Sequence, residues 1–493
     1  MVVSLLLALP ATLGLWLVSG GRGLPLRVAR PLAAGMAVAT LGLAVAVALT
    51  GSEVDRAWLP ELGVHWSLGV DGISVPLVLL TALMGVVVTA HAWVEVPSGG
   101  TPATFLGCLL LVEAGALATF TARDAVLFLV AFEVVLVPMW VLVGRYGDPH
   151  HPRARTEAAQ RFVLYTAVGS TTMLVGILLL VASAGTADLR ALAGGAGAAL
   201  GSGTQLAVAA LLVAGLAVKV PVLPFHTWLP PAHTTAPTAG SVLLAAVLLK
   251  MGTYGLVRLP VATVPDGFGR LAPVLAVAGA LGIVWGGLVC LVERDLKRLI
   301  AYSSVAHMGF VVLALASGSQ TGLQAALFAN VAHGVVSALL FVLVGGLKQR
   351  WGDVDLAVRR PALRETSPRL GFALVIGLAA SLGLPGLAGF WGELLAVYSA
   401  WAPAADRPRA LLVTCAVVAA VGAALAAAYA LRVAGLVWAG DRPDPEVRRT
   451  PDTVGVERWL LAGLATLVVV LGVAPMLVLS VTADAVASVG GAR

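Results

Sequence analysis

Charge is scarce in this sequence. Only 11% of the 493 residues are Asp, Glu, Lys or Arg, whereas 59% are hydrophobic, and the mean hydropathy is +0.97. Soluble domains carry about 25% charged residues, so the composition excludes an ordinary water-soluble globule and indicates an integral membrane protein. Lipid cannot pair with backbone groups, and the apolar runs lack the period-2 alternation of membrane strands, so we predict an all-α polytopic fold.

Cysteine and cofactor motifs are scarce as well. Cys108, Cys290 and Cys415 lie alone in separate apolar segments, without a CxxC pair or a His/Cys cluster. This spacing predicts neither an iron–sulfur cluster nor a zinc site. The sequence also lacks a Walker loop, a GxGxxG after a strand and an acidic metal cluster, so we expect no cofactor in this chain. The net charge of +6 is scattered over short loops, which argues against nucleic acid.

The apolar runs predict about fourteen transmembrane helices. The expected ranges are 1–19, 29–50, 72–96, 103–121, 125–143, 160–184, 205–229, 238–259, 271–292, 297–316, 320–347, 369–401, 409–439 and 458–483. Residues 1–18 lack a basic n-region, which favours a retained helix over a signal peptide. Lys and Arg concentrate in alternate loops, and placing these in the cytoplasm puts both termini on the outer side of a bacterial plasma membrane.

Two of these spans are interrupted by proline and glycine, around 218–237 (VKVPVLPFHTWLPPAHTTAPTAG) and 382–393 (LGLPGLAGFWGE). A membrane tolerates such breaks only inside protein or beside water. Each break lies in the fourth helix of a group of five, and because five is odd, two tandem groups are inverted relative to each other, as in many transporters. The predicted domains are three N-terminal helices (1–102), two inverted five-helix repeats (103–259 and 271–439) and a loop with the last helix (440–493).

Four ionisable residues lie well inside apolar spans: Glu133, Lys219, Lys250 and Glu393. A charge at the centre of a membrane helix costs roughly 2.5–3.5 kcal/mol on insertion scales, and such residues usually mark an ion or proton path. Glu133 and Lys219 are expected to form an ion pair, with a purely structural pair as the alternative. Lys250 has no carboxylate nearby in sequence, so it is a candidate proton acceptor.

Histidines connect the remaining candidates. His307 and His333 can relay protons between Lys250 and Glu393 because imidazole titrates near physiological pH; structural histidines are the alternative. On one helix, Asn330, His333 and Ser337 follow helical spacing and predict a polar stripe. Glu393 is either a proton exit or an acidic residue that the dipole of the following half-helix stabilises.

Weaker candidates accompany this series. His226 and His233 lie in the first break, where they provide either a side inlet or a hydrogen-bonded scaffold. Glu113 and Arg432 are also within apolar spans, and beyond electrostatic support the sequence assigns them no role.

Several segments resemble the antiporter-like subunits of respiratory complex I, most closely the M-type chain. They are FEVVLVPMW, AVKVPVLPFHTWLPPAHTTAPTAGSVLLAAVLLKMGTYGLVR, DLKRLIAYSSVAHMGF and GLPGLAGFWGE, and they extend over about 103–436. The resemblance implies an input pair at Glu133 and Lys219, a central relay at Lys250, His307 and His333, and a terminal acid at Glu393. L-type and N-type relatives usually carry lysine at the last position, and the L-type adds a long lateral helix that we do not expect here.

The expected function is therefore that of a proton-translocating subunit of NADH:quinone oxidoreductase, without a redox centre of its own. The resemblance implies NADH, FMN, iron–sulfur clusters and quinone in partner subunits, with the L-type and N-type chains as membrane neighbours. Two alternatives stay open: a subunit of a cation/proton antiporter or membrane-bound hydrogenase, and a scaffold that does not pump.

Overall fold

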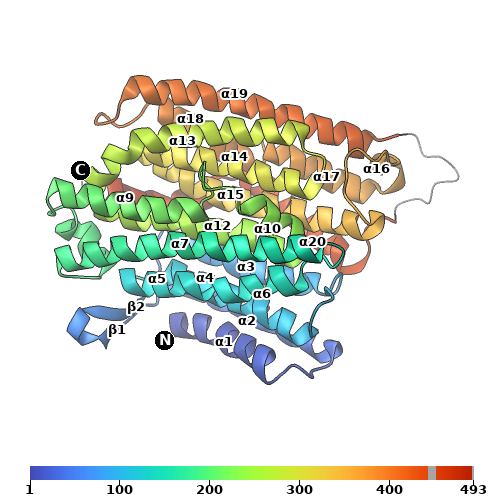
Figure 1. The fold of residues 1–493 in the computed structure, drawn as a ribbon, viewed down its shortest axis with the longest axis horizontal. Helices are drawn as coiled ribbons and strands as arrows, with labels where there is room; N and C mark the ends of the chain where they lie inside the picture. The colour runs from blue at the N-terminus through green and yellow to red at the C-terminus, as the bar shows by residue number, and fades with distance from the viewer. Residues whose placement is uncertain (442–450, 491–493) are drawn as a thin grey trace.

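The computed structural model describes residues 1–441 and 451–490. Its helices run roughly parallel and form one bundle, with α1 (Val2–Ser19) at one edge and α19 (Arg409–Val433) at the opposite edge (Figure 1). Within the described residues, twelve helices are long and apolar enough to cross a membrane, and three shorter apolar helices accompany them. The predicted all-α polytopic fold is confirmed, and each of the fourteen expected spans contains one or more of these helices.

Three helices and a hairpin precede residue 102. They are α1, α2 (Leu26–Thr50), β1 (Val54–Leu59), the short 3-10 helix η1 (Pro60–Leu62), β2 (Val64–Leu68) and α3 (Val75–His91). The antiparallel β1–β2 hairpin was not predicted, because it lies in a connection between apolar runs. Both chain ends lie at the same end of the bundle as this hairpin (Figure 1), which we call the hairpin end.

Residues 102–261 form the next group of helices. Its elements are α4 (Pro102–Thr121), α5 (Ala125–Val134), α6 (Leu136–Tyr146), α7 (Pro152–Ala184), α8 (Leu189–Ala191), η2 (Leu192–Ala196), α9 (Ser202–Lys219), α10 (Leu229–Thr235), α11 (Thr238–Leu243), η3 (Leu244–Leu248), α12 (Leu249–Leu256) and η4 (Val257–Val261). Elements α11 to η4 form one continuous apolar helix that includes the π-helical turns η3 and η4. π-helical turns within helices are frequent at functional sites.

The following residues, 265–441, form a second group. Its elements are α13 (Pro265–Val292), α14 (Leu296–Ala316), α15 (Gln320–Trp351), α16 (Leu363–Thr366), α17 (Pro368–Ser381), α18 (Ala388–Trp401), α19 and η5 (Ala434–Ala439). The helices α4, α14, α15 and the α11–η4 helix are almost wholly buried, whereas only about a third of the residues in the apolar parts of α7 and α19 are buried. Three of the predicted relay residues lie on these central helices.

The predicted last span, 458–483, is wrong as a single helix. Helix α20 (Gly455–Val473) ends inside the predicted span. Helix α21 (Met476–Gly490) begins after Pro475 and packs against α15 and α3. Proline lacks an N–H and disfavours helical backbone at the residue before it, which explains the break at Ala474 and Pro475. Part of the predicted domain 440–493, residues 442–450 and 491–493, lies outside the described residues.

Candidate functional site

The first broken helix ends at Lys219, the last residue of α9. The indole Nε1 of Trp228 donates a hydrogen bond of 2.9 Å to the carbonyl of Val218, which pairs one of the acceptors freed at the helix end. Trp228 is itself fully buried. The break therefore holds the Lys219 side chain inside the bundle, and it lies 2% exposed.

Aromatic rings surround the Lys219 ammonium. Its Nζ lies 5.2 Å from the ring centroid of Phe132 and 5.4 Å from that of Phe162, within the range of cation–π attraction. Among the described residues, this Nζ has no hydrogen-bond partner. The Lys219 ammonium is thus stabilised by two aromatic rings and by the packing around its side chain, without a hydrogen bond to the described residues.

The expected ion pair between Glu133 and Lys219 does not form. No ion pair within the described residues joins them, and Oε1 of Glu133 is buried there without a hydrogen-bond partner. Glu133 lies where α5 ends and α6 begins, and the Phe132 ring occupies the space beside the ammonium. Glu133 directly follows Phe132 in sequence, so it lies in the same region of the bundle as Lys219 without a direct contact.

Lys250 is bound by specific polar partners. It is fully buried and follows the π-helical turn η3. Its Nζ donates to the Ala245 carbonyl at 2.7 Å and lies 2.5 Å from Nδ1 of His333. The predicted contact between the central lysine and the α15 histidine is therefore present.

The polar stripe predicted on α15 faces this lysine. Asn330 accepts a hydrogen bond of 2.9 Å from Oγ1 of Thr253, three residues after Lys250. The Ser337 hydroxyl hydrogen-bonds to the backbone carbonyl of His333 one turn further along. The Asn330–Thr253 hydrogen bond thus fixes α15 against the α11–η4 helix.

His307 connects His333 to Glu393. The two imidazole centroids are 5.4 Å apart in an edge-to-face arrangement. Nδ1 of His307 lies 3.1 Å from Oε1 of Glu393, and its Nε2 lies 3.0 Å from the Ser381 hydroxyl. A cavity of about 30 Å³ is lined by both histidines, Ser381 and Glu393, large enough for a water molecule.

The second broken helix places Glu393. Helix α17 ends at Ser381 and α18 begins at Ala388. Gly383, at φ +73°, has no side chain in the space that Oε2 of Glu393 occupies, 2.6 Å from where a Cβ would stand. The glycine therefore allows both the left-handed backbone and the close approach of the carboxylate.

The weaker candidates lie apart from this chain of contacts. Both ring nitrogens of His233 lack a hydrogen-bond partner among the described residues, and the ring stacks on Phe341 at 4.6 Å. His226 contacts the Tyr302 ring edge at 6.4 Å. Glu113 is buried against Gly85, and neither of its carboxylate oxygens has a described partner. The structure does not bring these three residues into contact with Lys250, His333, His307 or Glu393.

Some polar residues escaped the sequence reasoning. The sequence analysis did not single out Ser381, Thr253 or Lys297. Lys297 is buried, and its Nζ donates a hydrogen bond of 2.5 Å to the Ala236 carbonyl. Lys297 is the first residue of the expected span 297–316, and its spacing from His307 on one helix was a usable signal. Arg432, left without a role, donates to the carbonyls of Cys290 and Glu293 at 3.3 and 3.0 Å, and so caps the C-terminal end of α13.

The arrangement is one of proton donors and acceptors. Within the described residues, no group of three or more His, Cys, Asp or Glu side chains is placed to hold a metal ion. Lys250, His333, His307 and Glu393 instead form a line of titratable groups in which neighbours touch or share a cavity. Such a line can pass protons by short transfers between adjacent groups.

Comparison with known proteins decides the family. The profile described as "NADH:quinone oxidoreductase/Mrp antiporter, TM" matches residues 122–421, more than half of the chain. The chain belongs to this family. It is 40% identical to NAD(P)H-quinone oxidoreductase chain 4 from Synechococcus sp. (strain JA-3-3Ab) over 389 residues, which cover 78% of this chain and 71% of the relative.

Another relative and a solved structure give the same picture. The chain is 36% identical to NADH-quinone oxidoreductase subunit M from Rhodobacter capsulatus over 444 residues, covering 88% of this chain and 83% of the relative. It superimposes on a chain of respiratory complex I from Thermus thermophilus with a TM-score of 0.85 and 31% identity, covering 100% of both chains. The family member described here is thus similar along its length to antiporter-like subunits of complex I.

Proposed function

We propose that this chain is the M-type, proton-translocating subunit of a bacterial NADH:quinone oxidoreductase. The observation that carries the proposal is the buried contact of Lys250 with His333, continued through His307 to Glu393. Relatives named subunit M and chain 4 support the complex I assignment. A glutamate at 393, where L-type and N-type relatives usually carry lysine, favours the M-type.

The proton steps follow the contacts. Lys250 gives a proton to Nδ1 of His333, and the proton passes to His307 across the small cavity that they line. Nδ1 of His307 faces Glu393, which releases the proton toward the outer side. Moving one charge across 100 mV requires about 2.3 kcal/mol, and one pKa unit corresponds to about 1.4 kcal/mol, so modest changes in proton affinity are of the right size.

Glu133 and Lys219 act as a separate input group. They have no direct contact with each other, and no hydrogen bond within the described residues joins Lys219 to Lys250. We propose that Lys219 influences Lys250 by its charge, and that the weaker candidates His226, His233 and Glu113 modulate the inlet.

The surrounding assembly follows from the same proposal. The hairpin end, which carries both termini (Figure 1), is the outer side of the plasma membrane, in agreement with the concentration of Lys and Arg in loops at the other end. NADH, FMN, iron–sulfur clusters and quinone belong to partner subunits, and L-type and N-type chains are the membrane neighbours. Residues 103–259 and 271–439 form the two inverted repeats.

The test replaces Lys250 by Met and, separately, Glu393 by Gln in the assembled complex. We expect NADH oxidation to continue at a reduced rate while fewer protons are taken up per NADH in membrane vesicles. Asp55→Asn, on the exposed hairpin, is the control and should pump normally. Normal pumping in both relay variants would reject the proposal in favour of the non-pumping scaffold.

A further inference from the structure

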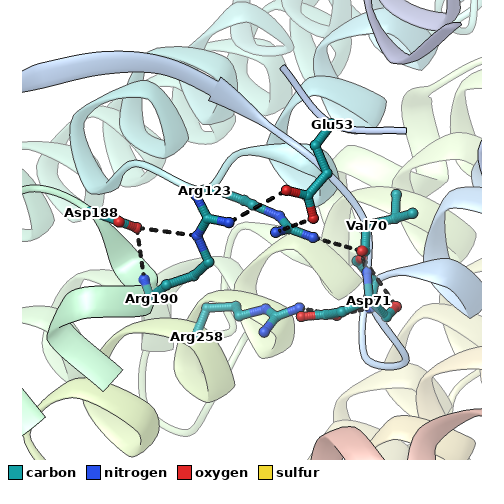
Figure 2. A network of polar contacts seen from close by, with 8 residues as sticks. Glu53, Val70, Asp71, Arg123, Asp188, Arg190 and Arg258 are labelled. Carbon is teal, nitrogen blue, oxygen red and sulfur yellow. Dashed lines mark hydrogen bonds and ion pairs between the residues drawn. The ribbon is translucent and has the colours of Figure 1, made fainter. Parts of the chain in front are cut away.

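Three arginines and three carboxylates form a network at the hairpin end, which the sequence reasoning did not identify (Figure 2). Arg258 pairs with Asp71, and Arg123 pairs with Glu53 at 2.6 Å. Arg123 also donates to the Val70 carbonyl at 2.7 Å. The network therefore fixes the segment before α3 against the end of the α11–η4 helix.

This network lies on the helix that carries the central lysine. Lys250, Tyr254 and Arg258 follow each other at intervals of four residues, which places them on one helix face. The Arg258 guanidinium lies 5.2 Å from the Tyr254 ring centroid, so the π-helical turn between them leaves them in contact. Eight residues correspond to a rise of about 12 Å; Arg258 is thus the permanent charge nearest to Lys250 along this face.

Tyr254 fills the space between the two cations. Its side chain is 2% exposed and packs against the rings of Phe120 and Phe128, with centroid distances of 5.2 and 6.3 Å. Its hydroxyl donates to the backbone carbonyl of Phe120 at 3.0 Å. The hydroxyl proton is therefore committed to a backbone acceptor, and the rings around it form an apolar plug.

A cavity with several charged side chains in its lining approaches the plug from the hairpin end. It has a volume of about 350 Å³ and is lined by Tyr254, Arg258, Asp71, Arg123 and Arg190, among others. This is ample room for water. Lys250 is not among its lining residues, so the cavity ends one helical turn short of the lysine.

The charged groups at the closed end of the cavity are poor proton carriers. The Arg258 guanidinium stays protonated in proteins. Burial raises the pKa of Asp71, but the Arg258 charge and hydrogen bond outweigh burial and hold that pKa below its ordinary value. Asp71 thus stays ionised near neutral pH and does not take up a proton from water.

We propose that Tyr254 and Arg258 form a seal that prevents protons on the outer side from reaching Lys250. Tyr254 excludes a water chain, and the fixed guanidinium disfavours an excess proton beside it. The inference rests on the proposed role of Lys250 as a proton carrier and on the hairpin end being outside. With this seal in place, protons are released at Glu393, and the path along the α11–η4 helix is closed to them.

The test measures passive proton flux through the reconstituted, assembled complex without NADH or quinone. A pH gradient is imposed across vesicles that contain an internal pH dye, and Arg258→Met is compared with Arg258→Lys. A full charge at about 12 Å in an effective dielectric of about 20 changes proton occupancy about tenfold. Asp71 offsets part of that charge, so we expect a severalfold faster leak in Arg258→Met and little change in Arg258→Lys.

Matched controls make the result decisive. Arg190→Met removes a charge from the half-exposed rim of the same network and should leak like the unmodified complex. An Arg258→Met complex that leaks no more than Arg190→Met would overturn the seal. If Arg258→Met does not assemble, Tyr254→Ala replaces it, with Tyr254→Phe as its control; equal fluxes in that pair would overturn the seal as well.

Combining Arg258→Met with Lys250→Met separates this inference from the proposed function. A leak that disappears in the double variant supports a seal directed at Lys250. A leak that persists overturns the link to the lysine. NADH-driven pumping by Lys250→Met alone tests the proposed function, and its outcome is independent of passive flux.

Discussion

The two buried lysines are held in different ways. Lys219 has aromatic rings on two sides and no described hydrogen-bond partner, although Glu133 is nearby. Lys250 donates to a backbone carbonyl and contacts His333, which continues to His307. Burying an unpaired charge is costly, so Lys219 is the less well stabilised of the two lysines. We therefore propose that the Lys250 side of the series transfers protons and that the Lys219 side acts through its charge.

The largest effect is expected at the second break, where Gly383→Ala should displace Glu393. A left-handed conformation costs a side-chain residue about 1–3 kcal/mol, and the new Cβ would lie 2.6 Å from Oε2 of Glu393. Overpacking typically costs a further ~1–3 kcal/mol. We expect lower thermal stability of the assembled complex together with fewer protons taken up per NADH.

Gly386→Ala is the matched control for that change. Gly386 also has a positive φ, +89°, but a Cβ there would meet nothing within 4 Å. It should lose stability through backbone strain alone and keep the proton yield. Equal loss of proton yield in both variants would mean that the break matters as a whole and that the Glu393 position does not.

Sequence reasoning identified the ionisable residues because isolated charges stand out in apolar helices. It also predicted that Lys250, His307, His333 and Glu393 act together, and the structure brings them into one line. It was wrong about the Glu133–Lys219 ion pair, since side-chain packing by Phe132 decides that contact. Helix spacing cannot show which ring occupies the space between two helices.

Other features depend on contacts between distant segments. Arg258 and Asp71 are 187 residues apart in sequence. Arg258 is the last residue of a segment that carries the resemblance, but the sequence assigned it no role, and Asp71 lies outside those segments. The β1–β2 hairpin lies in a connection, where weak local preferences leave several outcomes open. The break at Pro475 lies inside an expected span, and the proline itself was a local signal for it. The helices were therefore predictable from hydropathy, whereas the network of arginines and carboxylates at the hairpin end could be identified only in the folded structure.

A smaller effect would sharpen the contrast between the lysines. Lys219→Met removes a buried cation that lacks a described hydrogen-bond partner, and an unpaired buried charge is costly to keep in the folded state. Glu133 loses its neighbouring charge, which opposes this gain, so we expect a net stabilisation of about 1 kcal/mol. Thermal unfolding of the assembled complex measures it.

Lys250→Met provides the comparison for Lys219→Met. It also removes a buried charge, but it leaves the Ala245 carbonyl and Nδ1 of His333 without their donor. An unsatisfied buried polar group costs about 1–3 kcal/mol, so Lys250→Met should show no gain in stability. A larger stabilisation in Lys250→Met than in Lys219→Met would contradict the difference drawn between the two sites.

The smallest effect concerns an ion pair between the first and the second group of helices, at the end of the bundle opposite the hairpin. Lys348, at the end of α15, lies 2.7 Å from Oδ2 of Asp148, in the connection after α6. Burial raises the pKa of Asp148, but the Lys348 hydrogen bond and other donors lower it to about 2 from an ordinary 3.8. After solvent screening, we expect Lys348→Met to destabilise by about 1 kcal/mol at pH 7.

The sign of the pH dependence follows from that lowered pKa. The stabilisation is fully present above pH 3.8 and is lost as the pH falls through about 2. The difference in thermal stability between Lys348→Met and the unmodified complex should therefore be constant from pH 7 to about 4 and shrink in more acid solution. Asp148→Asn should reproduce it, and the double variant should add little. A difference that grows with acidity would show that Lys348 stabilises α15 without Asp148, and that the two halves of the relay are not joined by this pair.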